Sequence, residues 1–134
     1  MTRKTFLTLH AVVALLVGAV ALSAPGYLIA GVKQAQTSPA AEVMGRTVGV
    51  LIATMGVLAL SVRSHGDSPT MRSVLWANLL LQLAILPIDP IAYLAGTFHS
   101  LGSFLPNTLL HLALASGFVF YLRDMRVSSA ANVS

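Results

Sequence analysis

The sequence predicts an all-α integral membrane protein, a four-transmembrane-helix bundle that forms a single domain over residues 1–134. Three observations support this prediction. Hydrophobic residues make up 56% of the chain and charged residues only 9%, whereas a soluble domain has roughly 25% charged residues. Four apolar runs are each long enough to supply the roughly 20 residues that cross a bilayer. The segments between these runs are short, which leaves no room for a domain outside the membrane.

The first predicted helix covers about residues 5–24 and follows a basic pair at 3–4. The basic start, the apolar middle and the small residues Ala21 and Ser23 resemble a secretory signal peptide. However, the apolar run is longer than the core of roughly 7–15 residues that such peptides have. We therefore expect an uncleaved membrane helix that ends near Pro25.

The second predicted helix covers residues 39–62, and we expect the bundle to pack around it. Ser38 can cap the free amides at its start, and Pro39 suits the first helical turn. Glu42 lies near the positive end of the helix dipole, and Arg46 lies about one turn further into the span. Small residues recur at four-residue intervals here and in two other predicted helices, and such ridges allow close packing in membranes. The residues expected at these contacts are Ala14, Gly18, Gly45, Gly49, Ala53, Ala113 and Gly117.

The third predicted helix covers residues 69–86 and begins with a second serine–proline pair, Ser68 and Pro69. Asn78 and Gln82 are four residues apart and therefore share one face of this helix. We expect that face to point away from lipid, because buried amides need hydrogen-bond partners.

Two prolines within residues 87–90 interrupt the third helix. Because proline removes a donor from the helical ladder, we predict that the helix is kinked or broken there. Asp89 can cap a helix that restarts at Pro90. Two alternatives remain open: the helix continues, kinked, to Gly96, or it ends and a short interfacial helix follows over residues 90–98.

The fourth predicted helix covers residues 106–122, and residues 127–134 are expected to form a mobile tail. Near the end of this helix, Phe118, Phe120 and Tyr121 resemble an interfacial aromatic belt. Six of the eight Lys and Arg residues fall on the side that holds both termini, and the other side holds only Lys33 and Arg46. This imbalance predicts both termini in the cytoplasm, and we expect a bacterial inner membrane.

Four residues expected toward the non-cytoplasmic end form the candidate site: Glu42, Arg46, Asp89 and His111. Charged groups at membrane depth are costly unless they are paired, so we expect Arg46 to contact Asp89 or Glu42. Two interpretations follow. The cluster anchors an anionic or quinone-like headgroup, or it is a structural ion pair combined with a helix cap at Asp89.

His10 and His111 raise the question of haem or pigment binding. The two are expected to differ in height by several ångströms along the bundle, which argues against a haem held by both imidazoles. We expect each ring instead to contact a backbone carbonyl or to lie at the interface. If the chain holds a molecule at an interface, we expect a lipid, a quinone or a pigment, and we expect no intrinsic cofactor.

Other classes of site find no support in the sequence. The chain has no cysteine, which excludes disulfides and thiolate metal sites. It contains no HExxH, GxSxG or Walker-type motif, so we expect neither a metal site nor an enzyme. Its net charge of +4 is not gathered into a basic, aromatic surface, so we expect no nucleic-acid partner.

Three stretches together resemble the bacterial DoxX-like and related uncharacterised four-helix membrane proteins: LHAVVALLVGAVALSAPG, VMGRTVGVLIATMGVLAL and NTLLHLALASGFVFYL. The resemblance implies a four-helix fold, and some members of that group are named as subunits of membrane oxidoreductases. The proline pair at residues 87–90 departs from the group.

We therefore expect a non-catalytic accessory or structural subunit that packs against a larger membrane complex, respiratory or photosynthetic in kind. Its partners would be membrane lipids and the other proteins of that complex. The alternative is a free-standing small membrane protein that binds a lipid or quinone at its non-cytoplasmic end.

Overall fold

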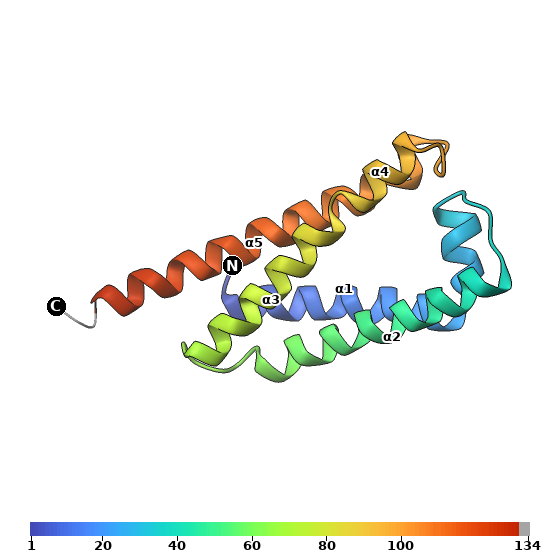
Figure 1. Ribbon diagram of the computed structural model, residues 1–134. Coiled ribbons are helices and arrows are strands. Elements are labelled where there is room, and N and C mark those ends of the chain that lie inside the picture. The colour runs from blue at the N-terminus through green and yellow to red at the C-terminus, as the bar shows by residue number, and fades with distance from the viewer. Residues whose placement is uncertain (132–134) are drawn as a thin grey trace.

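In the computed structural model, the long helices form two hairpins that diverge from the end carrying the N-terminus (Figure 1). The structure describes residues 1–131, with side chains to residue 125. The first hairpin consists of α1 (Arg3–Ser23) and α2 (Pro39–Val62). The second consists of α3 (Pro69–Ile85), α4 (Ile88–Leu94) and α5 (Leu105–Ala131). The chain is 81% helical, with no strand in the described part, so the predicted all-α fold is confirmed.

Four helical segments are long and apolar enough to cross a membrane: Arg3–Ser23, Pro39–Val62, Pro69–Leu94 and Leu105–Met125. Their number agrees with the four predicted spans. α3 and α4 together make the third span. A chain of this length and composition is consistent with an integral membrane protein.

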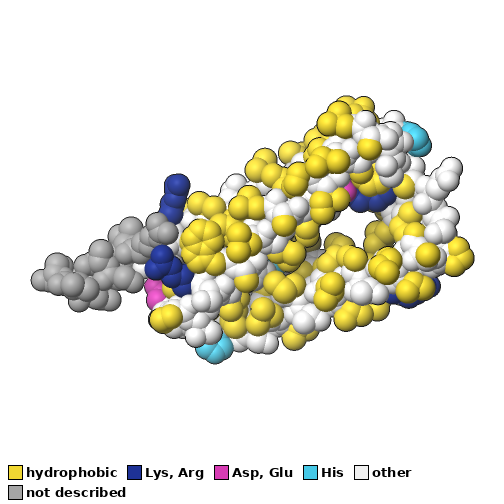
Figure 2. Space-filling model, viewed as in Figure 1, with side chains coloured by type: hydrophobic (Ala, Val, Ile, Leu, Met, Phe, Trp, Pro, Cys, Tyr) yellow, Lys and Arg dark blue, Asp and Glu magenta, His cyan; other side chains and the backbone are white. Residues whose placement is uncertain are grey.

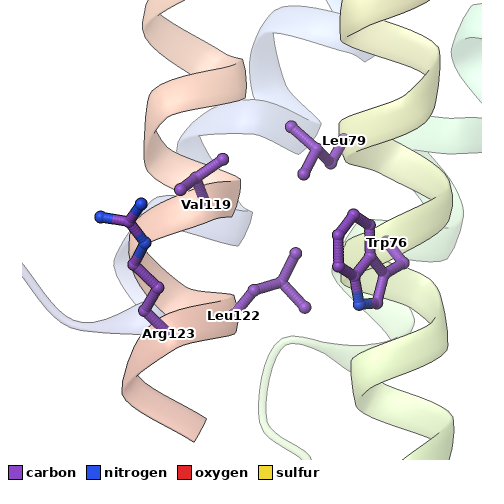
Figure 3. Close-up of a pocket in the computed structure, with 5 residues that line it drawn as sticks. All are labelled: Trp76, Leu79, Val119, Leu122 and Arg123. Carbon is purple, nitrogen blue, oxygen red and sulfur yellow. The ribbon is translucent and has the colours of Figure 1, made fainter. Parts of the chain in front are cut away.

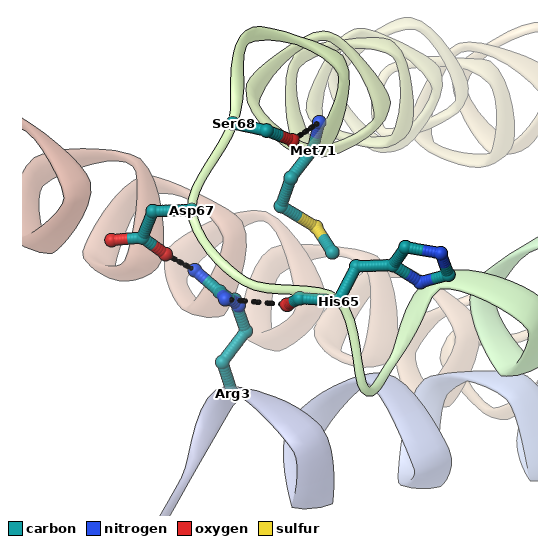
Figure 4. Close-up of polar contacts among 5 residues, drawn as sticks. All are labelled: Arg3, His65, Asp67, Ser68 and Met71. Carbon is teal, nitrogen blue, oxygen red and sulfur yellow. Dashed lines mark hydrogen bonds and ion pairs between the residues drawn. The ribbon is translucent and has the colours of Figure 1, made fainter.

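Both predicted serine caps are present. The Ser38 hydroxyl accepts a hydrogen bond from the Ala41 amide at 3.2 Å. The Ser68 hydroxyl accepts one from the Met71 amide at 3.1 Å (Figure 4). Each cap satisfies one of the free amides of a helix start, and both α2 and α3 begin at the proline predicted from the sequence.

The predicted kink in the third helix is wrong, because the helix bends by only 5° there. The helical assignment is interrupted at Leu86 and Pro87, and α4 resumes at Ile88. Backbone bonds continue across the interruption, with the Ile91 amide donating to the Pro87 carbonyl at 3.0 Å. Pro90 lies in the first turn of α4, where an amide needs no helical partner, so it does not bend the helix.

Two further boundaries differ from the prediction. α5 was expected to end near residue 122 but continues to Ala131. No glycine or proline follows Gly117 in the sequence, so the chain lacks the usual stop signals. The expected tail is therefore helical over residues 127–131, and residues 132–134 lie outside the described part. The expected first loop contains a π-helical turn, Tyr27–Val32.

At the N-terminal end, α1 inserts two apolar side chains, Phe6 and Leu7, between α3 and α5. Phe6 meets Phe118 edge to face, with ring centroids 4.9 Å apart. Gly117 leaves room for the Phe6 ring, which a Cβ at position 117 would overlap. The remaining members of this core are Met71, Leu75, Leu79, Ala115, Tyr121, Leu122 and Met125. The two hairpins thus share one apolar core at this end.

Within the first hairpin, small residues bring the backbones of α1 and α2 into contact. A Cβ on Gly18 would lie 2.8 Å from the Ala53 nitrogen and 2.9 Å from the Gly49 oxygen. Gly45 lies against Pro25 in the same way. Such close approach of two helix backbones favours helix association in lipid, where the burial of apolar surface adds little driving force. Of the other residues of the sequence-based set, Ala14 is buried in α1, Gly117 of α5 lies against Phe6, and Ala113 is exposed on α5.

Candidate functional site

Five side chains from four segments lie toward the end of the molecule opposite the N-terminus, in two groups: Asp89 contacts Lys33 and Asn107, and His111 contacts Gln82. We name them the polar cluster: Lys33, Gln82, Asp89, Asn107 and His111. Lys33 follows the π-helical turn, Gln82 and Asp89 lie on α3 and α4, and the other two lie on α5. Two residues of the sequence-based site, Asp89 and His111, belong to this cluster.

Asp89 is the centre of the polar cluster. Its Oδ2 atom forms an ion pair with the Lys33 ammonium group and accepts a hydrogen bond from Asn107 Nδ2 at 2.8 Å. Asp89 is buried, so its charge needs these partners. The predicted capping role is wrong, because α4 begins at Ile88 without a side-chain cap. The carboxylate points to other segments of the chain instead.

One level further into the bundle, His111 Nδ1 lies 2.5 Å from Gln82 Oε1. Asn107 and His111 are four residues apart on α5, and Gln82 and Asp89 are seven apart along the third span. Residues at these spacings share a helix face, so the two polar contacts lie one above the other between the helices. The polar cluster therefore extends from the end of the bundle toward its middle.

The buried face of α3 changes character along its length. Met71 and Leu75 make its first part apolar, and beyond them the buried residues include the amides Asn78 and Gln82, with exposures of 0% and 3%, beside Leu79. Asn78 Oδ1 lies 3.1 Å from His10 Nε2 of α1. The prediction that Asn78 and Gln82 point away from lipid is confirmed. Polar groups thus extend from the cluster to His10, whose buried Nδ1 has no hydrogen-bond partner among the described residues.

Each histidine contacts a side-chain amide rather than the expected backbone carbonyl: His10 contacts Asn78, and His111 contacts Gln82. Because Asn78 and Gln82 are separated by one helical turn, the imidazoles are staggered by about 6 Å along α3.

The other two residues of the sequence-based site, Glu42 and Arg46, are separate from Asp89. They approach each other along α2 at 3.7 Å, as an i,i+4 pair with side chains 34% and 47% exposed. One of the two expected contacts of Arg46 is therefore present. The partner of Asp89 is Lys33, which sequence reasoning missed. The available signal was that Lys33 is the one cation of the segment between the first two helices.

Further contacts beside the polar cluster join the two hairpins. The Ser100 hydroxyl donates to Gln34 Oε1 at 2.9 Å, and the Lys33 ammonium lies 5.3 Å from the centre of the Phe98 ring. At the opposite end, the Arg3 guanidinium pairs with Asp67 and donates to the His65 carbonyl at 3.0 Å (Figure 4). The hairpins are therefore joined at both ends.

Between these two junctions, the space-filling view shows an opening bordered by hydrophobic side chains (Figure 2). Acidic and basic side chains meet beside it, below α4 (Figure 2), where the ion pair of Lys33 and Asp89 joins α4 to the first hairpin. The cluster offers an ammonium, an amide and an imidazole as donors, and the borders of the opening are apolar. This combination suits a molecule with a polar head and an apolar chain.

Comparisons of the chain with protein-family models, with curated proteins and with solved structures found no match. The DoxX-like resemblance therefore stays a prediction, and the functional interpretation depends on the geometry described above.

Proposed function

We propose that the protein binds one amphipathic membrane molecule, a quinone or a lipid, at the polar cluster. The observation that carries this proposal is the position of the cluster beside an opening with apolar borders. The head of the ligand would accept hydrogen bonds from Lys33, Asn107 or His111, and its chain would occupy the opening.

Energetics favour a ligand role for these groups over a purely structural one. Interhelical hydrogen bonds in membranes contribute on average only about 0.6 kcal/mol each. An ionisable group at membrane depth costs about 3 kcal/mol on insertion scales. A purely structural junction between the hairpins could be built from apolar residues without that cost. Ionisable side chains in membrane spans therefore mark binding or transport sites by default.

The proposal includes an orientation in a bacterial inner membrane with both termini in the cytoplasm. The N-terminus, the α2–α3 connection and the end of α5 lie at one end of the molecule (Figure 1). Arg3, Lys4, Arg63, Arg72 and Arg123 lie in or next to these segments, and Lys33 and Arg46 belong to the other end. This distribution supports the orientation. The ligand head would then lie near the non-cytoplasmic face.

The test is to identify and quantify the small molecules that co-purify with the protein in a mild detergent. Organic extraction followed by mass spectrometry should yield about one quinone or lipid per chain from the wild type. Asp89→Asn and His111→Leu should lose most of that molecule. Arg46→Gln is the matched control, because Arg46 is a half-exposed cation outside the cluster. Equal recovery from all four proteins would contradict the proposal.

A second candidate function is that of an accessory subunit of a larger membrane complex, as the DoxX-like resemblance implies. The low burial of α2 favours it: only 17% of the residues in its most apolar window are buried inside the protein, against 39% for α1. Partner helices could cover that surface. Co-migration with a larger complex on native gels would support this function, and migration alone with a bound lipid or quinone would support the first.

A further inference from the structure

A groove separate from the polar cluster lies between α3 and α5, near the start of α3 and the end of α5. It encloses about 200 Å³ and is lined by Trp76, Leu79, Val119, Leu122 and Arg123. Leu79, Leu122 and Trp76 project into the space between the helices, whereas the Arg123 side chain extends along α5 on the side away from Trp76 (Figure 3). The groove is thus apolar between the helices, and Arg123 is the charged member of its lining, on α5.

We propose that this groove binds one anionic phospholipid, with Arg123 holding the phosphate and an acyl chain lying against Trp76, Leu79 and Val119. The site goes beyond the proposed function, because it lies at the opposite end of the protein from Asp89 and requires a different headgroup charge.

The charge of Arg123 is available to a ligand. Its guanidinium makes no hydrogen bond or ion pair with the other residues that the structure describes. Guanidinium groups bind phosphate oxygens with two parallel hydrogen bonds, which makes arginine well suited to a phosphodiester. Arg123 is also the first charged residue of α5, directly after the apolar run FVFYL, which suits a position at the lipid headgroups.

The surrounding surface has the matching charge. A second cavity at the same end, of about 270 Å³, is lined by Arg72 together with Asp67, Ser68, Pro69 and Met125. The described basic side chains of this end outnumber the acidic ones by five to two: Arg3, Lys4, Arg63, Arg72 and Arg123 against Asp67 and Asp124. Basic residues beside a membrane attract anionic lipids, with a contribution from each that corresponds to about fivefold in binding.

The apolar part of the groove reaches the surface of the protein at Trp76, a surface that lipid would cover in a membrane. Trp76 is 39% exposed, and Leu80, Leu83 and Phe120 on the same two helices are exposed as well. An occupant must therefore be resident in the bilayer. Trp76 lies seven residues after the start of α3, roughly 10 Å along the helix, and tryptophan favours the headgroup level of the membrane.

Trp76 also provides the test, because it is the only tryptophan in the chain. The protein is reconstituted into vesicles that contain brominated phosphatidylglycerol or, at equal mole fraction, brominated phosphatidylcholine. Bromine quenches indole fluorescence on contact. The anionic lipid should quench Trp76 with a relative binding constant about five times that of the zwitterionic lipid.

Arg123→Gln should reduce that preference to near one, while Arg123→Lys should retain most of it. Arg46→Gln removes the same charge from the other end of the protein and should leave the preference unchanged, as should Asp89→Asn in the polar cluster. Concentrated salt should weaken the preference of the wild type by screening. Equal quenching by the two lipids in the wild type, or a full preference in Arg123→Gln, would overturn the proposal. The polar-cluster proposal is tested by the molecules that co-purify with Asp89→Asn. A failure of the Trp76 quenching test therefore leaves that proposal intact.

Discussion

Lys33 and Asp89 form an ion pair across 56 residues of sequence, and this pair joins the two hairpins at the end of the molecule away from the apolar core of Phe6 and Leu7. At the other end, Phe6 and Leu7 join the hairpins by packing between α3 and α5. The two junctions therefore differ in chemistry: the one at the N-terminal end combines an apolar core with the ion pair of Arg3 and Asp67, and the other depends on polar and charged contacts. Changes at the charged junction should alter the spacing of the hairpins without unfolding either one.

The ion pair can be tested by a double-mutant cycle. Asp89→Asn and Lys33→Met should each lower the free energy of unfolding by about 2 kcal/mol, because each leaves a charged or polar group without its partner. The double variant should lose less than the sum, and the difference measures the coupling. Thermal unfolding in detergent gives the change in the free energy of unfolding for each single variant and for the double variant. Strictly additive effects would show that the two side chains do not interact.

A disulfide can test the same junction directly, because the native chain contains no cysteine. Ser100 and Gln34 contact each other through a hydrogen bond of 2.9 Å, so Gln34→Cys combined with Ser100→Cys should cross-link on oxidation. After cleavage at a protease site engineered into the α2–α3 connection, the two halves should run as one band on a denaturing gel until the disulfide is reduced. Gln34→Cys with Ser116→Cys is the control, since Ser116 bonds only within α5 and should not cross-link.

The helices themselves follow from local signals in the sequence. Ser38 and Ser68 are each followed by proline, and this capping chemistry acts within four residues, so both helix starts were predictable. The number of membrane spans was also predictable, because each span corresponds to one continuous apolar run in the sequence. The kink failed as a prediction because the effect of a proline depends on its place in a helix. Pro90 falls in the first turn of α4, where it replaces an amide without a partner.

The candidate site was only partly predictable, because it depends on which segments meet. Asp89 and His111 could be chosen as costly polar groups in a membrane, without knowledge of the fold. Their partners could not, since Lys33 reaches Asp89 only because the chain after α1 folds through the π-helical turn Tyr27–Val32. Arg46 was assigned to the same site because it is a charged residue at the same end. In the structure it pairs instead with Glu42, one turn away on the same helix.

Close packing of α1 against α2 predicts that Gly49→Ala destabilises the protein. A Cβ at this position would lie 2.9 Å from the Leu22 nitrogen and 3.0 Å from the Gly18 oxygen. These are backbone atoms, which cannot move aside cheaply. Overpacking costs about 1–3 kcal/mol, which outweighs the gain of up to about 1 kcal/mol from replacing glycine by alanine in a helix.

The matched control for Gly49→Ala is Gly66→Ala, because nothing lies within 4 Å of a Cβ at position 66. This variant should stay within about 0.5 kcal/mol of the wild type. Unfolding of both variants in detergent, titrated with a denaturing surfactant, compares the two sites. If Gly49→Ala were as stable as Gly66→Ala, the α1–α2 contact would be looser than the structure describes.

The distribution of basic residues predicts the orientation of the chain, and single cysteines can measure it. Gly66 lies in the α2–α3 connection, at the end that carries the N-terminus, and Gln36 lies in the α1–α2 connection at the other end (Figure 1). In intact bacterial cells, a membrane-impermeant maleimide should label Gln36→Cys, whereas Gly66→Cys should react only after lysis. The physical reason is that Lys and Arg beside short loops are retained on the cytoplasmic side.

Labelling of Gly66→Cys alone would reverse the orientation and move the polar cluster to the cytoplasmic face. Labelling of both positions in intact cells would mean that the two hairpins do not span the membrane as pairs, which contradicts the architecture on which the ligand proposal rests.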